Sequence, residues 1–239
     1  MNFKFVGNLS VKEDAIKKDK SANGTEYKRF NGAVVKDNDR AFVELFGMKP
    51  KDGTIKFFDN DRKSLSVDWD DRFDPSIVKS AATFSKNYID KESYLSAWDA
   101  IDEIEERLDD LTAKPVVVSG MVQKNFYDGK VSNRFVIRNI TFAAEDAKPQ
   151  LNIGAIVYFR AEDFDLDNWK DEKKILLNGF TSENIDKDHK GMFVPQTFVI
   201  DAGKIDFENE KHVKRLGFIL RAFGLDLVDG KPKVAKLKK

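Results

Sequence analysis

The sequence contains no cysteine and only two histidines, and both shortages exclude common kinds of active site. Without cysteine the chain can form no disulfide, no thiolate metal site and no cysteine nucleophile, which fits a reducing cytosol. His189 and His212 stand far apart, and the sequence has no serine–histidine–aspartate arrangement and no glycine-rich phosphate loop. We therefore expect a protein that is not an enzyme and that uses no cofactor and no metal.

Net charge and long apolar runs are lacking as well. The 41 basic residues equal the 41 acidic ones, so total charge does not indicate nucleic acid, although one groove can still be locally basic. No stretch reaches the roughly 18 apolar residues of a membrane span, and the first residues lack the apolar core of a signal peptide. These absences predict a cytoplasmic protein without a membrane partner.

Phenylalanine, in contrast, is abundant: there are 20, and aromatic residues make up 12% of the chain, which favours strands and packed cores. Residues 11–26 are polar and lysine-rich and are expected to form a mobile loop. Helical spacing of apolar residues predicts helices near 74–88 and 93–111. Period-two alternation predicts strands near 3–9, 27–35, 40–46, 116–122 and 134–142.

This element order predicts an α+β fold, mainly β with helices. It matches an OB-like five-stranded Greek-key barrel in which helices are inserted between the third and fourth strands. Glycines within the strands, Gly7 and Gly120 among them, would supply the bulges or bends that a small barrel needs. An ordinary mixed α+β domain is the alternative.

The chain is expected to divide into the barrel with its helical insert at residues 1–144, a linker at 145–150 and a smaller β-rich second domain at 151–226. The second domain opens with a strand and ends in a helix near 207–223. Its similar element order leaves open that it is a diverged OB copy. Residues 227–239 are rich in lysine and are expected to form a disordered basic tail.

The candidate site is the outer face of the second and third strands. Single-stranded nucleic acid is held by bases that stack on aromatic rings and by basic side chains along the phosphates. An OB-fold uses this face and the loops beside it. Because side chains alternate along a strand, the face is expected to collect Tyr27, Arg29, Asn31, Phe42 and Phe46.

The loops beside this face add further candidates. Phe126 and Tyr127 are adjacent, so at least one of them must be exposed or in a turn. Lys124, Lys130 and Arg134 flank the pair and would contact phosphates. The first loop would add more cations, namely Lys17, Lys18, Lys20 and Lys28. The alternative for each aromatic residue is an ordinary place in the core.

Two acidic segments suggest metal binding only superficially. Asp186 opens a run like a calcium loop, but Lys190 stands at position five and Thr197 replaces the glutamate at position twelve, so we interpret the run as a hairpin turn. Residues 68–74 are acidic, yet nothing in the sequence makes their carboxylates converge as a metal-dependent nuclease requires. We interpret them as a solvated loop that ends in a helix cap at Asp74.

Three short runs carry a family resemblance. Residues 40–47, 169–174 and 206–212 resemble uncharacterised proteins encoded by tailed phages of Gram-positive bacteria, and the likeness spans the whole chain. More loosely, residues 1–144 are similar to phage single-stranded DNA-binding proteins of the OB class. The resemblance implies a protein that coats DNA in an infected cell, beside replication or host proteins. Many such proteins end in an acidic recruiting tail, whereas residues 236–239 here are basic, which puts a recruiting role in doubt.

The sequence thus favours a non-enzymatic single-stranded DNA-binding protein that acts in DNA replication or recombination. A phage structural or host-protein interaction protein built on the same barrel is the alternative, which the zero net charge favours. A metal-dependent nuclease ranks third because no ligand set is evident. The oligomeric state stays open.

Overall fold

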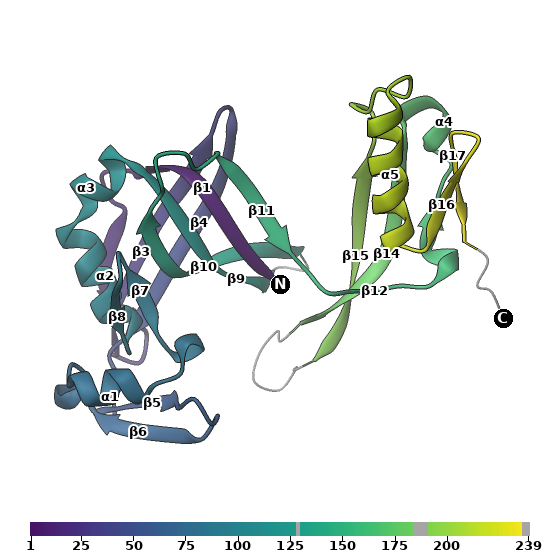
Figure 1. Ribbon diagram of the computed structural model, residues 1–239. Helices are drawn as coiled ribbons and strands as arrows, with labels where there is room; N and C mark the ends of the chain where they lie inside the picture. Colours follow the sequence, from purple (N-terminus) through teal and green to yellow (C-terminus); the bar gives the residue numbers. More distant parts are fainter. Residues whose placement is uncertain (128–129, 184–190, 236–239) are drawn as a thin grey trace. The chain divides into compact units, whose positions relative to one another are not determined.

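The computed structural model describes residues 1–127, 130–183 and 191–235, with the backbone alone at residues 125–127, 130–131 and 161. The chain divides into two compact units, Met1–Gly154 and Ala155–Lys239. Strands predominate and helices are few, so the prediction of a mainly β, α+β protein is confirmed (Figure 1). Among the described residues, no helix is both long enough and apolar enough to cross a membrane.

Five long strands form the centre of the first unit. β3 pairs antiparallel with β1 and β4, β10 runs parallel to β4 and antiparallel to β9, and β9 pairs antiparallel with β1. These five strands are therefore joined pairwise in a cycle within a large mixed sheet. Their bounds are β1 Asn2–Ser10, β3 Glu26–Lys36, β4 Asp39–Met48, β9 Pro115–Tyr127 and β10 Lys130–Phe142.

Alternation along these strands builds the core. Phe3 and Phe5 of β1 are buried on one face, and their rings contact Phe135 of β10 edge-on at 5.3 and 5.1 Å between centroids. Phe30 of β3 and Ile137 of β10 are fully buried in the same cluster. Each such side chain contributes roughly 1.5–3 kcal/mol through burial, so this face of the sheet is the main source of stability.

Two glycines allow backbones to approach closely. A Cβ atom on Gly120 would lie 2.0 Å from the carbonyl oxygen of Val136, and a bulge in β10 lies between Ile137 and Asn139. The bulge therefore lies in β10, opposite Gly120, and not in the strand that carries the glycine. A Cβ atom on Gly47 would lie 2.3 Å from the backbone nitrogen of Trp98, so this glycine lets a helix start against the end of β4.

The segment between β4 and β9 begins with a hairpin, β5 (Thr54–Phe58) and β6 (Ser64–Asp68). Helix α1 (Pro75–Ser80) follows, and Asp74 caps it by accepting hydrogen bonds from the hydroxyl and the backbone N–H of Ser76. These hydrogen bonds lower the pKa of Asp74. The predicted role of Asp74 as a helix cap is confirmed.

The first predicted helix is too long. It was expected to reach residue 88, but α1 stops at Ser80 and a second hairpin follows, β7 (Asn87–Ile89) and β8 (Glu92–Tyr94). β7 pairs in parallel with β10. Hydrogen bonding to the edge of a long strand outweighs helical spacing here, because local propensity is weaker than tertiary contact.

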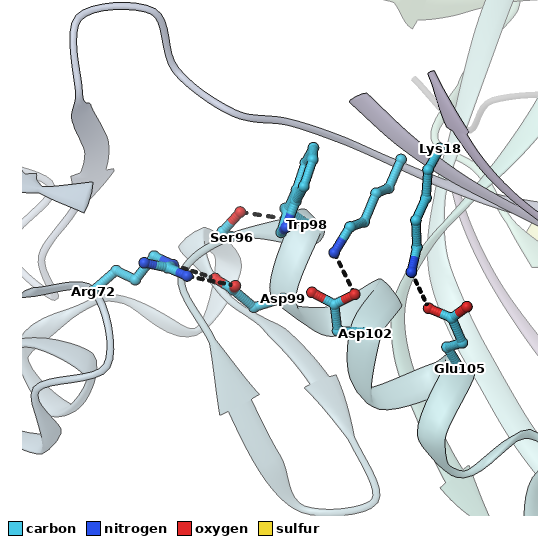
Figure 2. A network of polar contacts seen from close by, with 8 residues as sticks. Lys18, Arg72, Ser96, Trp98, Asp99, Asp102 and Glu105 are labelled. Atoms are coloured by element: carbon cyan, nitrogen blue, oxygen red, sulfur yellow. Dashed lines mark hydrogen bonds and ion pairs between the residues drawn. The ribbon is translucent and has the colours of Figure 1, made fainter. Parts of the chain in front are cut away.

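The second predicted helix is divided into α2 (Ala97–Glu106) and α3 (Leu108–Ala113), which cover the sheet beside β7 and β8 (Figure 1). Ser96 caps α2, accepting from the N–H of Trp98 at 3.0 Å. Three ion pairs hold its polar side, as Figure 2 shows in part: Lys18 with Glu105 at 2.7 Å, Arg72 with Asp99 at 2.8 Å, and Lys28 with Asp102. The helix is therefore tied to the first strands of the sheet.

Two further strands form where the sequence predicted a loop and an interdomain linker. Residues 11–26, expected to form a loop, contain β2 (Ile16–Lys20), which pairs with the first half of β3. Residues 150–154, expected to link and open the second domain, form β11 (Gln150–Gly154), which pairs with the first half of β1. β1 and β3 pair with each other only through Asn8–Ser10 and Ala33–Val35, so each leaves a free edge that these short strands occupy.

The second unit has its own core, in which Trp169, Ile175 and Leu220 are buried. Its sheet has the order β12–β14–β13, with β15 paired to β14, and a separate hairpin joins β16 to β17. The described strands here do not repeat the cycle of the first unit. The bounds are β12 Val157–Tyr158, β13 Phe164–Asp165, α4 Trp169–Glu172, β14 Lys174–Glu183, β15 Met192–Asp201, α5 Glu210–Ala222, β16 Leu225–Val228 and β17 Lys231–Val234.

The predicted tail is ordered as far as Val234. Leu225 is fully buried, Pro232 is buried, and the indole N–H of Trp169 donates to the carbonyl oxygen of Gly230 at 3.0 Å. The prediction of a disordered tail from residue 227 is therefore wrong for the hairpin, because apolar residues at alternate positions attach it to α5. Residues 236–239 lie outside the described chain.

Candidate nucleic-acid interface

A concave groove of about 610 Å³ lies on the outer side of β2, β3 and β4. It brings together the predicted residues Tyr27, Arg29, Asn31, Phe42 and Phe46. The alternation argued from the sequence therefore places these five side chains in one hollow. The segment before β2 adds Lys12 and Asp14 to the lining, and β2 itself adds Lys17 and Asp19.

Strand register sets the order of side chains across the groove. Lys17 on β2 lies opposite Arg29 on β3, which in turn lies opposite Phe46 on β4. Two residues along, Asp19 lies opposite Tyr27. Cationic and aromatic side chains therefore stand in the same row, about 5 Å apart from strand to strand.

The aromatic rings of the groove are open to solvent. Phe42 is 69% exposed and Phe46 42% exposed, although phenylalanine is usually buried. The ring of Tyr27 packs against that of Phe46 with 5.3 Å between centroids and an interplanar angle of 33°. Exposed rings that cluster in one hollow mark a binding surface more often than exposed apolar residues that occur singly.

A buried carboxylate organises the arginines at this face. Glu44 on β4 is 8% exposed and accepts from Arg29 Nη2 at 2.7 Å through one oxygen and from Arg134 Nε through the other. Arg134 comes from β10, so Glu44 joins three strands. Alternation along β4 puts Glu44 on the same face as Phe42 and Phe46, but no role for it was predicted from the sequence. The signal for such a role was one acidic residue, Glu44, close to site candidates that include the two arginines Arg29 and Arg134.

The groove is positive although the chain is neutral. Four basic side chains and two acidic ones line it, a net charge of two positive. Lys17 lies 3.7 Å from Asp14, but both side chains are largely exposed, so this pair neutralises little. Lys12 and Arg40 supply the other rim cations. The local field can therefore attract an anion.

Several predicted cations lie elsewhere. Lys124 is 8% exposed and donates to Asn133 Oδ1 at 2.7 Å, so it is held within the sheet, and its predicted phosphate contact stays a prediction. Lys28 is 6% exposed and pairs with Asp102, and Lys18 pairs with Glu105. Lys28 is thus buried in its ion pair, whereas Lys18 forms its ion pair at the surface with 52% of its side chain exposed. Of the four lysines expected from the first loop, all of which are described, Lys17 is the one that lines the groove.

The loop between β9 and β10 cannot be placed against the groove. Its flanking strands pair Tyr127 with Lys130 and Phe126 with Val131 along the backbone. The side chains of Phe126, Tyr127 and Lys130 lie outside the described part of the structure, so their predicted role in binding stays a prediction.

Of the two acidic segments, the structure describes residues 68–74. Residues 69–71 form a single 3-10 turn, and in the described ranges no group of three or more histidine or acidic residues could hold a metal ion. The calcium-like run from Asp186, interpreted as a hairpin turn, and His189 lie outside the described chain. His212 is exposed on α5.

Comparison with known proteins does not identify a ligand for this groove. No protein-family model matches the chain, and no curated protein matches it either. The resemblance to phage proteins stays a prediction from the sequence. What the groove binds must therefore be argued from its own chemistry, which is a positive lining, exposed rings and arginines held by a buried acid.

Proposed function

We propose that the protein binds single-stranded DNA in the groove of its first unit, without catalysis, and that it serves DNA replication or recombination in phage-infected cells. The observation that carries this proposal is the shared row of side chains in which Lys17 and Arg29 stand beside Phe46, with the exposed ring of Phe42 in the same hollow. A row of basic side chains and exposed aromatic rings suits a single strand of nucleic acid, which presents phosphates and bases in alternation.

Energetics favour a single strand over a duplex. A base stacked on an aromatic side chain contributes about 1–3 kcal/mol, but in a duplex the faces of the bases are already stacked on their neighbours. Phe42 and Phe46 offer such contacts only to unstacked bases. The two surplus positive charges of the groove add a salt-dependent attraction for phosphates.

We propose further that the cycle of pairings among β1, β3, β4, β10 and β9 is an OB-type barrel. Its support is the connectivity, with β10 parallel to β4 and with α2 and α3 between β4 and β9. The groove lies on the outer face of the second and third strands of this cycle, where OB-folds bind oligonucleotides.

The test is a titration of a labelled single-stranded oligonucleotide at two salt concentrations, read by fluorescence anisotropy. Phe42→Ala should weaken binding by about 1–3 kcal/mol, or about five-fold or more, because one stacking surface is removed. Phe84→Ala is the matched control, since Phe84 is 54% exposed and does not line the groove. Absence of binding by the parent protein at low salt would refute the proposal.

A protein-interaction role is the second candidate. The second unit has a hollow of about 580 Å³ lined by Tyr158, Phe180 and Phe193, which are 48%, 40% and 60% exposed. Exposed apolar side chains of this kind also suit a protein surface. A parent protein that ignores single-stranded DNA but captures a replication or host protein would favour this second function.

A further inference from the structure

A second hollow, of about 310 Å³, adjoins the groove at the paired ends of β2 and β3. Asp19 and Tyr27 line both hollows, so the two adjoin and the tyrosine stands at their boundary. On the groove side, the ring of Tyr27 packs on Phe46. The second hollow is lined by Lys18, Asp19, Lys20, Glu26, Tyr27 and Trp98.

Trp98 is held in position from several sides. Its backbone nitrogen donates to the Ser96 hydroxyl, and Gly47 lets β4 approach that same nitrogen. The ammonium of Lys28 lies 4.2 Å from the centroid of the indole, and the ring of Trp69 meets it edge-on at 6.4 Å. Figure 2 shows the indole projecting from the start of α2. A ring fixed in this way loses little freedom when a ligand stacks on it.

The charges of the second hollow cancel, unlike those of the groove. Its two lysines and two acids sum to zero. Lys18 donates to Glu105 at 2.7 Å, which raises the pKa of the lysine, and Lys20 lies 3.6 Å from Glu26. Because the two lysines of the lining are matched by two acids, the hollow exerts little net attraction on a phosphate. It suits an uncharged, flat group whose edge carries donors and acceptors, which describes a nucleobase.

We infer that the strand bound in the groove continues past Tyr27 and places a base in the second hollow, against the indole of Trp98. The inference rests on the proposed function and extends it. The groove holds the phosphates and stacks bases on Phe42 and Phe46, and the second hollow adds a subsite for one more base. Trp98 and Tyr27 are then contact residues, whereas Lys18 and Glu105 shape the wall.

The experiment records anisotropy of a labelled oligonucleotide and tryptophan fluorescence in the same titration. In the parent protein, binding should quench tryptophan fluorescence, because a base stacked on indole quenches it. Trp98→Phe should retain binding within a few-fold but lose most of the quenching. Trp69→Phe is the matched control: Trp69 contacts Trp98 but does not line the hollow, so quenching should persist in this variant.

The outcomes separate the two claims. Binding by anisotropy with equal quenching in Trp98→Phe and in the parent would overturn the subsite and leave the proposed function standing. Absence of an anisotropy change would remove the proposed function itself. Should Trp98→Phe fold poorly, the parent can be photo-crosslinked to a 4-thiothymidine oligonucleotide and its peptides mapped. Crosslinks at Tyr27 or Trp98 support the subsite, and crosslinks confined to residues 40–48 overturn it.

Discussion

The two faces of β3 use the same residue types for opposite purposes. Lys28 and Arg29 are neighbours in sequence, yet Lys28 is buried under Trp98 and paired with Asp102, while the side chain of Arg29 is 44% exposed in the groove. Phe30 is fully buried, and Phe42 on the paired strand is 69% exposed. The difference shows that residue type alone does not decide a side chain's environment, because the face of the strand decides whether it is buried in the core or exposed in the groove.

The largest expected effect contrasts the two phenylalanines. Phe30→Ala should lower the free energy of unfolding by about 3–5 kcal/mol, since it leaves a cavity in the core. Phe42→Ala should change it by less than about 0.5 kcal/mol, since the exposed ring leaves no cavity. Denaturant unfolding of both variants measures this difference. Equal losses in the two variants would mean that Phe42 is structural, and the comparison would fail.

The next effect contrasts the two neighbouring cations. Lys28→Ala should cost about 2 kcal/mol of folding stability, less than a fully buried pair because Asp102 keeps 37% of its side chain exposed. Lys28→Met should cost less, because it keeps the apolar stem. Arg29→Ala should cost under about 1 kcal/mol but reduce the slope of log affinity against log salt by about one. An unchanged slope would remove Arg29 from the phosphate contacts.

The smallest expected effect concerns Tyr94, a partly buried tyrosine, and the pH dependence of folding stability. The phenol of Tyr94 on β8 is partly buried and donates to Glu103 at 2.7 Å. Burial is the larger cause and the hydrogen bond to this carboxylate the second, and both raise the pKa of Tyr94. A raised pKa in the folded state stabilises the protein below the ordinary tyrosine pKa of about 10, and this contribution is lost as the pH rises above it. Tyr94→Phe should therefore remove one late-titrating phenol from the ultraviolet titration and reduce the loss of stability at alkaline pH. Titration of the parent's tyrosines as a single group would contradict this.

The arrangement of the groove followed from the sequence because period-two alternation is a local property. Tyr27, Arg29 and Asn31 occur at alternate positions of one strand, and a short turn pairs that strand with the one that carries Phe42 and Phe46. Register over a short hairpin is set by the turn, so the shared face could be read directly. The helix cap at Asp74 was equally local, since it depends on a residue and its next neighbours.

Several differences from the sequence predictions arise from contacts between distant segments. Lys28 was expected among the cations beside the face, but it pairs with a helix that begins some 70 residues later. The first helix was predicted to reach residue 88, yet residues 87–94 form a hairpin, because the edge of β10 was available. Glu44 gained its role only when β10 brought Arg134 beside it.

By itself the sequence determined the fold class of the protein, the order of its principal strands and the outward set of aromatic and basic residues on β3 and β4. Those properties depend on composition and on alternation between neighbouring residues. Tertiary structure decided which lysines form ion pairs, where Glu44 binds its two arginines, and that Trp98 borders a hollow adjoining the groove. The physical reason is that ion pairs and hollows form between segments far apart in the chain, whose approach no local pattern records.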